Sequence, residues 1–409
     1  MPTTDFSLAS LLTLRRILVA LAAILFATPQ GRWLAYRYTS LLNWVIAANL
    51  PRSSLFNTLY FAQNLPGPLL RFTIEILAYP RPKHDPWYKP VRGNDWKGVW
   101  IAEGVGKVQD VGAWTQGVRQ ETDVVIFYAH GGGYTSGHAA MFMDSWILWI
   151  EELKKHGLNA KILSLEYGLA PMNKYPSQLQ ESLRAYKYLI EDLKIDPSKI
   201  ILGGDSAGAN LMSATLLALH RRRFDTALPM PRGALLAHPW MTLDLSSSSH
   251  TRNQSLDYIH LGSLVKNRLN WLPADQQSLE YLRSDPYVAP VYAPKDTFVE
   301  FPHMFVAIGQ WEVFYDDQVE FVSRLRADGV DVVVKEAEEM PHLWLLIPEV
   351  VGGDLKVWKE GWAKVAEWTA QVVRGERDED GEEAGDGLEG SRSWEKIGMS
   401  GSILHARLG

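Results

Sequence analysis

The segment 204–208, which reads Gly-Asp-Ser-Ala-Gly directly after the apolar run 200–202, most constrains what this chain can fold into. An apolar run followed by Gly-x-Ser-x-Gly is typical of a strand that turns sharply into a helix, with the serine held at the turn in a strained conformation. Glycines two residues away on either side let neighbouring backbone pass without meeting a Cβ atom. The pattern predicts that the Ser206 hydroxyl projects from a strand end as a nucleophile.

A second glycine-rich segment, residues 130–133, follows the strand-like run 124–128. Acyl transfer builds negative charge on the carbonyl oxygen, and fixed backbone N–H groups stabilise that charge by about 3 kcal/mol per donor. A triple glycine between a strand and a downstream nucleophile therefore indicates an oxyanion hole and not merely a flexible turn. We expect the amides of Gly132, Gly133 and Ala207 to be the donors. The residues that support the two motifs are His130, Gly131, Gly204 and Gly208.

Activation of a hydroxyl at neutral pH requires a general base with a pKa near 7, which indicates a histidine. The chain order of serine, acid, histidine found in hydrolases of this kind leaves only His342 and His405 of the eleven histidines. His405 lies in a polar tail, whereas His342 follows the apolar run 330–334 in a short loop. His342 is therefore the predicted base.

The segment 310–317, after the strand-like run 304–309, offers three carboxylates for the acid that orients the base. A residue two or three positions beyond the strand end points into the site, while Asp316 and Asp317 resemble the first turn of a helix, where acids favour the helix dipole. We predict that Glu312 accepts a hydrogen bond from His342. Asp316 is the alternative acid.

These motifs resemble those of the hormone-sensitive-lipase-like family of α/β-hydrolase esterases. The resemblance covers about residues 120 to 350 and includes Tyr167-Gly168-Leu169-Ala170-Pro171, Tyr175-Pro176, Asp285-Pro286 and Ala289-Pro290. It implies a Ser-acid-His esterase with a helical cap that acts on short or medium acyl esters of apolar alcohols. Two positions depart from the family pattern: Glu312 stands where aspartate is most common, and Met172 where glutamate is frequent.

Short apolar runs alternate with helical patterns through the middle of the chain, which predicts an α/β fold with a mostly parallel sheet and helices on both faces. The expected strands are 124–129, 161–166, 199–203, 233–237, 304–308 and 330–335. The segment 177–193 is an expected core-facing helix, with its apolar residues on one side.

Composition excludes several classes of protein. A formal net charge of −6 without a basic stripe argues against nucleic-acid partners. The absence of cysteine excludes disulfides, thiolate zinc sites and a cysteine nucleophile. The histidines show no close ligand spacing, so we expect no metal and no other cofactor.

The first 32 residues are predicted to be an apolar membrane-anchor or interfacial segment. Residues 17–28 are uncharged and mostly apolar, between Arg15-Arg16 and Pro29. At ~1.5 Å per residue this run is shorter than the ~30 Å hydrocarbon core, and a longer span would bury both arginines. A cleaved signal peptide and a cap helix of a soluble intracellular protein are the alternatives. The expected location is a membrane surface, with the endoplasmic reticulum as one candidate.

Residues 33–119 are expected to form an N-terminal cap region, and residues 120–374 the catalytic domain with a cap excursion at about 243–285. The excursion has an apolar face that includes Tyr258, Leu264 and Trp271. Residues 375–409 are rich in Gly, Glu, Asp and Ser, which predicts an acidic disordered tail.

These features predict a serine carboxylic ester hydrolase that removes a short acyl group, acetyl being the first candidate, from a lipophilic alcohol such as a sterol, terpenoid or polyketide. The same residues would serve an acyltransferase, a lactonase or a formamidase. A small-molecule receptor without catalysis is disfavoured because His342 is present.

Overall fold

The computed structural model describes residues 51–225, 227–352, 355–376, 394–397 and 403–404. The predicted membrane segment and His405 lie outside these residues, as does most of the predicted tail. None of the described helices combines the length and the apolar composition needed to cross a membrane.

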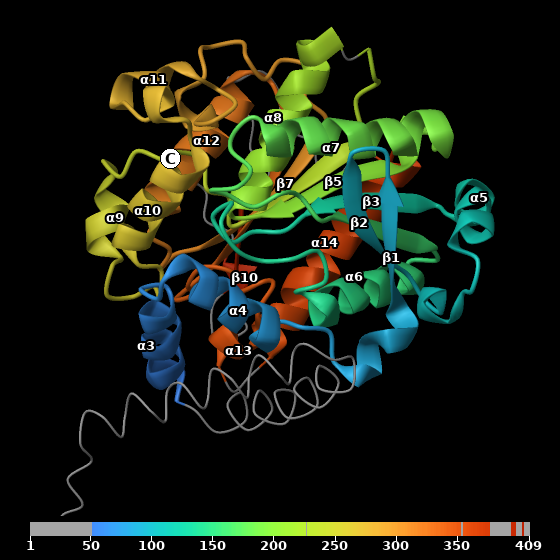
Figure 1. Cartoon of the computed structure of the whole chain (residues 1–409), viewed down its shortest axis with the longest axis horizontal. Coiled ribbons are helices and arrows are strands. Elements are labelled where there is room, and N and C mark those ends of the chain that lie inside the picture. The colour runs from blue at the N-terminus through green and yellow to red at the C-terminus, as the bar shows by residue number, and fades with distance from the viewer. Residues whose placement is uncertain (1–50, 226, 353–354, 377–393, 398–402, 405–409) are drawn as a thin grey trace, which may run out of the picture.

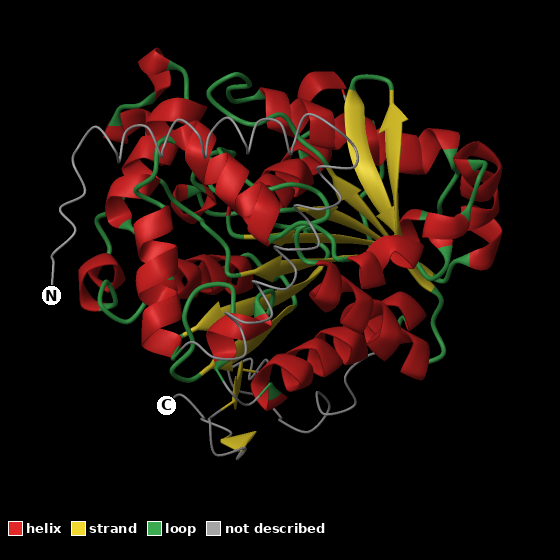
Figure 2. Ribbon diagram, turned by 60° about the horizontal axis from the view of Figure 1, so that its bottom comes forward, coloured by secondary structure: helices red, strands yellow, loops and turns green. Residues whose placement is uncertain are grey.

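A twisted sheet runs through the centre of the molecule (Figures 1 and 2). Its order is β1-β2-β4-β3-β5-β6-β7-β8-β9-β10. Strands β3 to β9 are parallel to one another, whereas β2 pairs antiparallel with β1 and β4, and β10 pairs antiparallel with β9. The strands are β1 (Tyr88–Gly93), β2 (Trp96–Ile101), β3 (Val124–Ala129), β4 (Ala160–Leu165), β5 (Ile200–Asp205), β6 (Gly233–Ala237), β7 (His303–Gly309), β8 (Val332–Ala337), β9 (Trp394–Ile397) and β10 (Ile403–Leu404).

Helices cover both faces of this sheet. In Figure 1, α7 and α8 lie above the strands, and α6 and α14 lie below them and pack against each other. The α-helices are α3 (Arg52–Ala62), α4 (Gly67–Leu77), α5 (Val111–Glu121), α6 (Met143–Lys155), α7 (Ser177–Lys187), α8 (Ala207–His220), α9 (Ser248–Arg252), α10 (Leu261–Trp271), α11 (Leu279–Ser284), α12 (Tyr315–Ala327), α13 (Pro348–Val351) and α14 (Lys356–Arg374).

The predicted α/β class with a mostly parallel sheet is confirmed. All six predicted strands are present within about two residues of their expected bounds. Every residue of β3, β4, β5 and β6 is buried, as expected for parallel strands covered on both faces, whose sequences are mostly apolar. The predicted helix 177–193 is observed as α7 followed by a π-helical turn, Tyr188–Asp192.

Strands β1 and β2 were not among the predicted strands, and they lie in the segment expected to be an N-terminal cap region. β1 contains Pro90 and is partly exposed along its length, as is usual for an edge strand. Its mixture of charged and polar residues gives little apolar signal. The short strands β9 and β10 lie within the segment predicted to be a tail.

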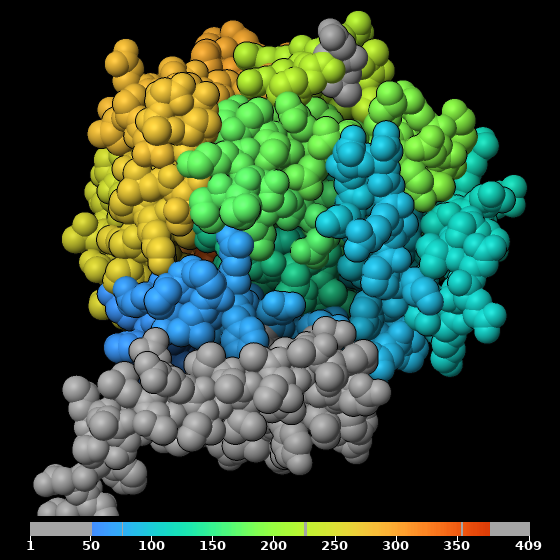
Figure 3. Space-filling model, viewed as in Figure 1, coloured from blue at the N-terminus to red at the C-terminus, as the bar shows by residue number. Residues whose placement is uncertain are grey.

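Helices α9, α10 and α11 form the excursion between β6 and β7, and α3 and α4 lie beside it (Figure 3). Gln63, just after α3, joins the two parts. Its side chain donates to Tyr258 O at 2.7 Å and accepts from Ser263 Oγ at 3.0 Å. Of the predicted apolar face, Tyr258, Leu264 and Trp271 are buried.

Candidate active site

Ser206 lies at the junction of β5 and α8 with φ 51° and ψ −118°. This is a region that residues other than glycine rarely occupy. The turn is held on both sides by backbone hydrogen bonds, from Ser206 N to Ala237 O at 3.0 Å and from Trp240 N to Ser206 O at 3.2 Å. The predicted strand-to-helix turn is thus present in the backbone.

The flanking glycines are required by close backbone contacts. A Cβ atom on Gly204 would lie 2.5 Å from Gly208 O, and one on Gly208 would lie 2.0 Å from Ala129 O. Both distances are far below normal contact distances. The close packing of β3, β5 and α8 therefore explains why the sequence has glycine at positions 204 and 208.

The glycine-rich loop lies against the serine. A Cβ atom on Gly131 would be 3.1 Å from Ser206 Cβ, and Gly132 and Gly133 have φ values of 104° and 60°. His130 is buried, stacks on Tyr167 at 4.3 Å and supports the base of the loop.

Three backbone N–H groups belong to the segments next to Ser206. Ala207 is the first residue of α8, so its N–H has no partner within the helix. Among the described residues, no acceptor is hydrogen-bonded to the N–H groups of Gly132, Gly133 or Ala207. The N-terminus of α8 adds a favourable partial positive charge. The geometry suits the binding of an oxyanion.

Glu312 and His342 are both buried and hydrogen-bonded to each other, with 2.8 Å between Glu312 Oε2 and His342 Nδ1. Glu312 follows β7 and His342 follows β8. The Phe314 ring lies edge-on to the His342 ring at 5.1 Å. The structure thus brings together the acid and the base that the sequence predicts.

Glu312 accepts four hydrogen bonds. Oε1 accepts from His238 Nδ1 at 2.7 Å and Gly309 N at 2.5 Å, and Oε2 accepts from His342 Nδ1 and from Gln318 Nε2 at 2.9 Å. Burial alone would raise the pKa of Glu312, but the favourable electrostatics and hydrogen bonds of the two histidine rings lower the pKa to about 2. Glu312 is therefore ionised at neutral pH.

Asp316, the alternative acid, lies in the first turn of α12. Its carboxylate accepts hydrogen bonds from Arg252 Nη2 at 2.6 Å and from Ser249 N at 2.8 Å. It therefore connects α12 to α9 and is not hydrogen-bonded to His342.

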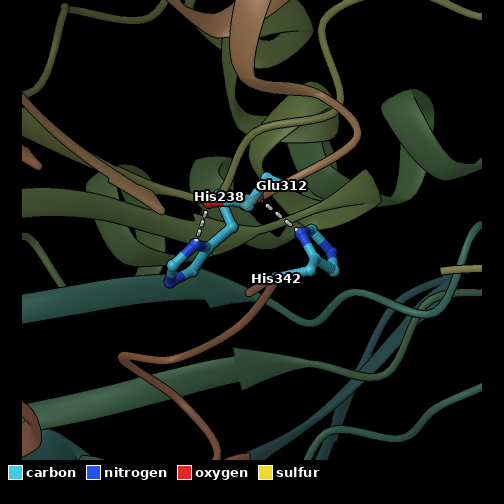
Figure 4. Close-up of side chains that lie close together, drawn as sticks. All are labelled: His238, Glu312 and His342. Atoms are coloured by element: carbon cyan, nitrogen blue, oxygen red, sulfur yellow. Dashed lines mark hydrogen bonds and ion pairs between the residues drawn. The ribbon is translucent and has the colours of Figure 1, made fainter. Parts of the chain in front are cut away.

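His238 was not predicted from the sequence. It follows β6, has φ 52° and is fully buried, and Figure 4 shows it on the opposite side of Glu312 from His342. The sequence feature that could have indicated His238 was a polar residue directly after a predicted apolar strand. That strand lies between the strands that end at the serine and at the acid, an adjacency that only the sheet order reveals.

Asp257 was also missed. Its Oδ1 accepts from His342 N at 3.2 Å and its Oδ2 accepts from Val313 N at 2.9 Å. One buried side chain from the excursion thus binds the backbone of both loops that hold Glu312 and His342. Burial raises the pKa of Asp257 to about 6.

Asn253 begins an Asn-x-Ser sequence, the pattern that accepts N-linked glycans. The side chain is buried, and its Nδ2 donates to Gln310 O at 2.9 Å and Glu312 O at 2.8 Å. Asn253 therefore supports the loop of Glu312 and is inaccessible to modification in the folded protein.

The excursion also contacts the glycine-rich loop. Trp271, at the end of α10, stacks on Tyr134 with ring centroids 3.8 Å apart and planes 7° apart. Asn267 Oδ1 accepts from Thr135 Oγ1 at 2.8 Å. Because Tyr134 directly follows Gly133, α10 holds the loop of candidate oxyanion donors in place.

His238, Glu312 and His342 each offer one ligand atom, and these three atoms lie within 4.8 Å of one another, a set that could hold a metal ion. His238 Nε2 accepts a hydrogen bond from Leu345 N at 3.2 Å, so Nε2 carries no proton and Nδ1 does. A metal at Nδ1 would need the opposite tautomer, whose Nε2 proton would face the Leu345 N–H. The residues therefore fit a hydrogen-bonded network better than a metal site.

Comparisons with known proteins identify the fold family. A model of the α/β-hydrolase fold family matches residues 126–346, more than half of the chain. An acetyl-hydrolase of Streptomyces hygroscopicus is 26% identical over 56% of this chain and 71% of its own. An esterase of Acinetobacter venetianus is 30% identical over 51% of this chain and 63% of its own. Arylacetamide deacetylase of Mus musculus is 25% identical over 53% of this chain and 67% of its own.

Solved structures share the fold. A hormone-sensitive lipase from a metagenome library has a TM-score of 0.63 at 22% identity and covers 79% of this chain and 99% of its own. An esterase of the bacterial hormone-sensitive lipase family has a TM-score of 0.63 at 23% identity and covers 80% and 99%. The predicted family resemblance is confirmed. The chain therefore belongs to the α/β-hydrolase fold family and is a carboxylic ester hydrolase.

Proposed function

We propose that this protein hydrolyses carboxylic esters through an acyl-enzyme formed on Ser206. The observation that supports this most directly is the buried hydrogen bond between Glu312 and His342, which follow β7 and β8 in the same parallel part of the sheet as the Ser206 strand β5. Carboxyl ends of parallel strands meet at one edge of a sheet, where hydrolases of this fold assemble their catalytic residues.

In the first half-reaction, Ser206 Oγ forms a bond to the ester carbonyl carbon while His342 Nε2 takes the hydroxyl proton. The oxyanion is stabilised by the N–H groups of Gly132, Gly133 and Ala207. The bond to the alcohol oxygen then breaks, and His342 returns the proton to the departing alcohol. Glu312 keeps the proton on Nδ1 of His342 and stabilises the imidazolium form.

In the second half-reaction, water attacks the acyl carbon of the acyl-enzyme while His342 takes a proton from it. Collapse of the second tetrahedral intermediate releases the carboxylic acid and returns the proton to Ser206. An alcohol in place of water would make the same residues an acyltransferase, and an internal ester would make them a lactonase. A product assay with a competing alcohol separates hydrolysis from transfer.

We propose a short acyl group, acetyl first, on a lipophilic alcohol of the sterol, terpenoid or polyketide kind. The relatives include proteins named acetyl-hydrolase, arylacetamide deacetylase and neutral cholesterol ester hydrolase 1. The proposed cap supplies buried Tyr258 and Trp271 around the site, and an apolar cap favours an apolar alcohol.

We also propose that residues 1–32 attach the protein to a membrane surface, where such substrates partition. Full-length protein should remain with the membrane fraction, and a variant that lacks residues 1–32 should lose this association. If the full-length protein and the shortened variant were distributed equally between the membrane and soluble fractions, the attachment would be contradicted.

Hydrolysis of p-nitrophenyl acetate by the wild type and by Ser206→Ala tests the nucleophile. We expect kcat to fall by about 10⁴-fold or more in the variant. Ser213→Ala is the matched control, because Ser213 is also buried in α8. A fluorophosphonate should label the wild type and Ser213→Ala but not Ser206→Ala. Undiminished turnover by Ser206→Ala would refute the proposal.

A further inference from the structure

We propose that His238 is a positioning residue that holds Glu312 and the His342 loop in their working arrangement, an inference that rests on the proposed function. The His238 ring lies edge-on to the His342 ring with centroids 5.7 Å apart, but its two ring nitrogens are hydrogen-bonded to Glu312 and Leu345 N. It contacts Glu312 Oε1 through Nδ1 at 2.7 Å, on the side of the carboxylate away from His342 (Figure 4).

The tautomer of His238 follows from its second hydrogen bond. Leu345 N donates to His238 Nε2 at 3.2 Å, so this nitrogen is an acceptor and Nδ1 bears the proton. His238 is therefore neutral and donates to Glu312. Leu345 lies three residues after His342, so one imidazole ring joins the acid to the loop of the base.

The ring itself is well fixed. His238 N donates to Ala307 O at 2.8 Å, and the Trp344 ring packs edge-on to the imidazole with centroids 5.7 Å apart. The side chain is fully buried. A donor that is held this firmly fixes the position of the carboxylate that it contacts.

Glutamate needs such a partner more than aspartate does. Its extra methylene adds a rotatable bond, and ordering that bond costs conformational entropy. Without His238, Oε1 of Glu312 would keep Gly309 N as its donor from the described residues, while Oε2 would keep His342 and Gln318. The carboxylate would then be held less firmly on the Oε1 side. Two imidazoles on opposite oxygens fix the plane of the carboxylate and therefore the direction in which His342 points.

The test compares His238→Leu with His238→Asn. Asparagine can place an amide N–H near the position of Nδ1, whereas leucine cannot donate at all. Outer side chains that support a residue in contact with the acting group typically contribute about 10–100-fold in activity, so we expect kcat for p-nitrophenyl acetate to fall by that factor in His238→Leu. We expect KM to stay within about threefold, because substrate contacts are unchanged. His238→Asn should recover most of kcat.

A double-mutant cycle separates positioning from general packing. If His238 acts through Glu312, His238→Leu should cost less than about threefold in the Glu312→Ala background. His84→Leu is the control for loss of a buried histidine, because His84 contacts the Asp144 carboxylate at 3.0 Å within another cluster. It should leave kcat per folded molecule unchanged. Titration with a fluorophosphonate measures the number of active sites in each variant that can react.

Three outcomes would overturn the inference: full activity of His238→Leu, equal losses in the leucine and asparagine variants, or the same loss with and without Glu312. The proposed function fails separately, if Ser206→Ala hydrolyses as fast as the wild type. An inactive Ser206→Ala with a fully active His238→Leu would reject the positioning role alone.

Discussion

At the scale of single residues, the ionised carboxylate of Glu312 links the site to the stability of the fold. Its pKa is lowered from 4.5 to about 2, so the folded state binds its proton less tightly than the unfolded state does. The resulting stabilisation is present above pH 4.5 and is lost as the pH falls toward 2. At ~1.4 kcal/mol per pKa unit it is on the order of 3 kcal/mol.

We therefore predict that Glu312→Gln loses this part of the pH dependence. Urea unfolding between pH 6 and pH 3 should show a smaller drop in the free energy of unfolding for the variant than for the wild type. Its kcat at pH 7 should be lower by about 10³–10⁴-fold, because the tautomer of His342 is no longer fixed. If the free energy of unfolding changed with pH equally in the two proteins, the assignment of this pH dependence to Glu312 would be contradicted.

The sequence predicted Ser206, Glu312 and His342 because each follows a recognisable apolar strand, and the chain order of the three residues reduced the number of candidates. It could not identify His238 or Asp257. Both act on residues more than 50 positions away in the chain. Their contacts depend on sheet order and on the path of the excursion, which a local pattern does not encode.

At the scale of elements, the meeting of β3, β5 and α8 is set by glycine. Gly208→Ala would place a Cβ atom 2.0 Å from Ala129 O, so we expect a loss of about 3 kcal/mol or more in the free energy of unfolding. Gly117→Ala is the matched change in α5, where the nearest atom lies at 3.5 Å. It should stabilise the helix by about 0.5–1 kcal/mol. Thermal unfolding of both variants measures the contrast, and equal effects would refute this account of the turn.

The buried parallel strands were predictable because their sequences are mostly apolar, and the edge strands were not. β2 is largely buried but contains Gly98 and Lys97, and β1 has little apolar pattern. Their place in the sheet comes from antiparallel pairing of β1 with β2 and of β2 with β4. That pairing is a tertiary property, so propensity alone does not reveal it.

At the scale of the whole molecule, the excursion between β6 and β7 and the glycine-rich loop form one packed unit through Trp271. Its ring stacks on Tyr134, and its Nε1 donates to Gln178 Oε1 at 3.0 Å. We predict that Trp271→Ala lowers the free energy of unfolding by about 3–5 kcal/mol. It should also lower kcat, because the candidate oxyanion donors lose their support.

Leu269→Ala, two residues earlier on α10, provides the comparison. Leu269 is 45% exposed, so its truncation should change the free energy of unfolding by about 0.5 kcal/mol or less. Chemical unfolding and turnover of p-nitrophenyl acetate should be measured on both variants. An effect of Leu269→Ala as large as that of Trp271→Ala would show that α10 does not brace the loop through stacking.

The four adjacent strands β5, β6, β7 and β8 are each followed within a few residues by one member of the set Ser206, His238, Glu312 and His342. The spacing of the strands therefore sets the backbone position from which each of these side chains extends, whatever the length of the segment that joins one strand to the next. The stretch between β6 and β7 could be replaced by one of a different length and shape without disturbing the register of the four strand ends, provided that Asn253 and Asp257 keep their partners. In related chains, substrate preference can in this way change without a change in the catalytic residues, because the shared sheet positions those residues.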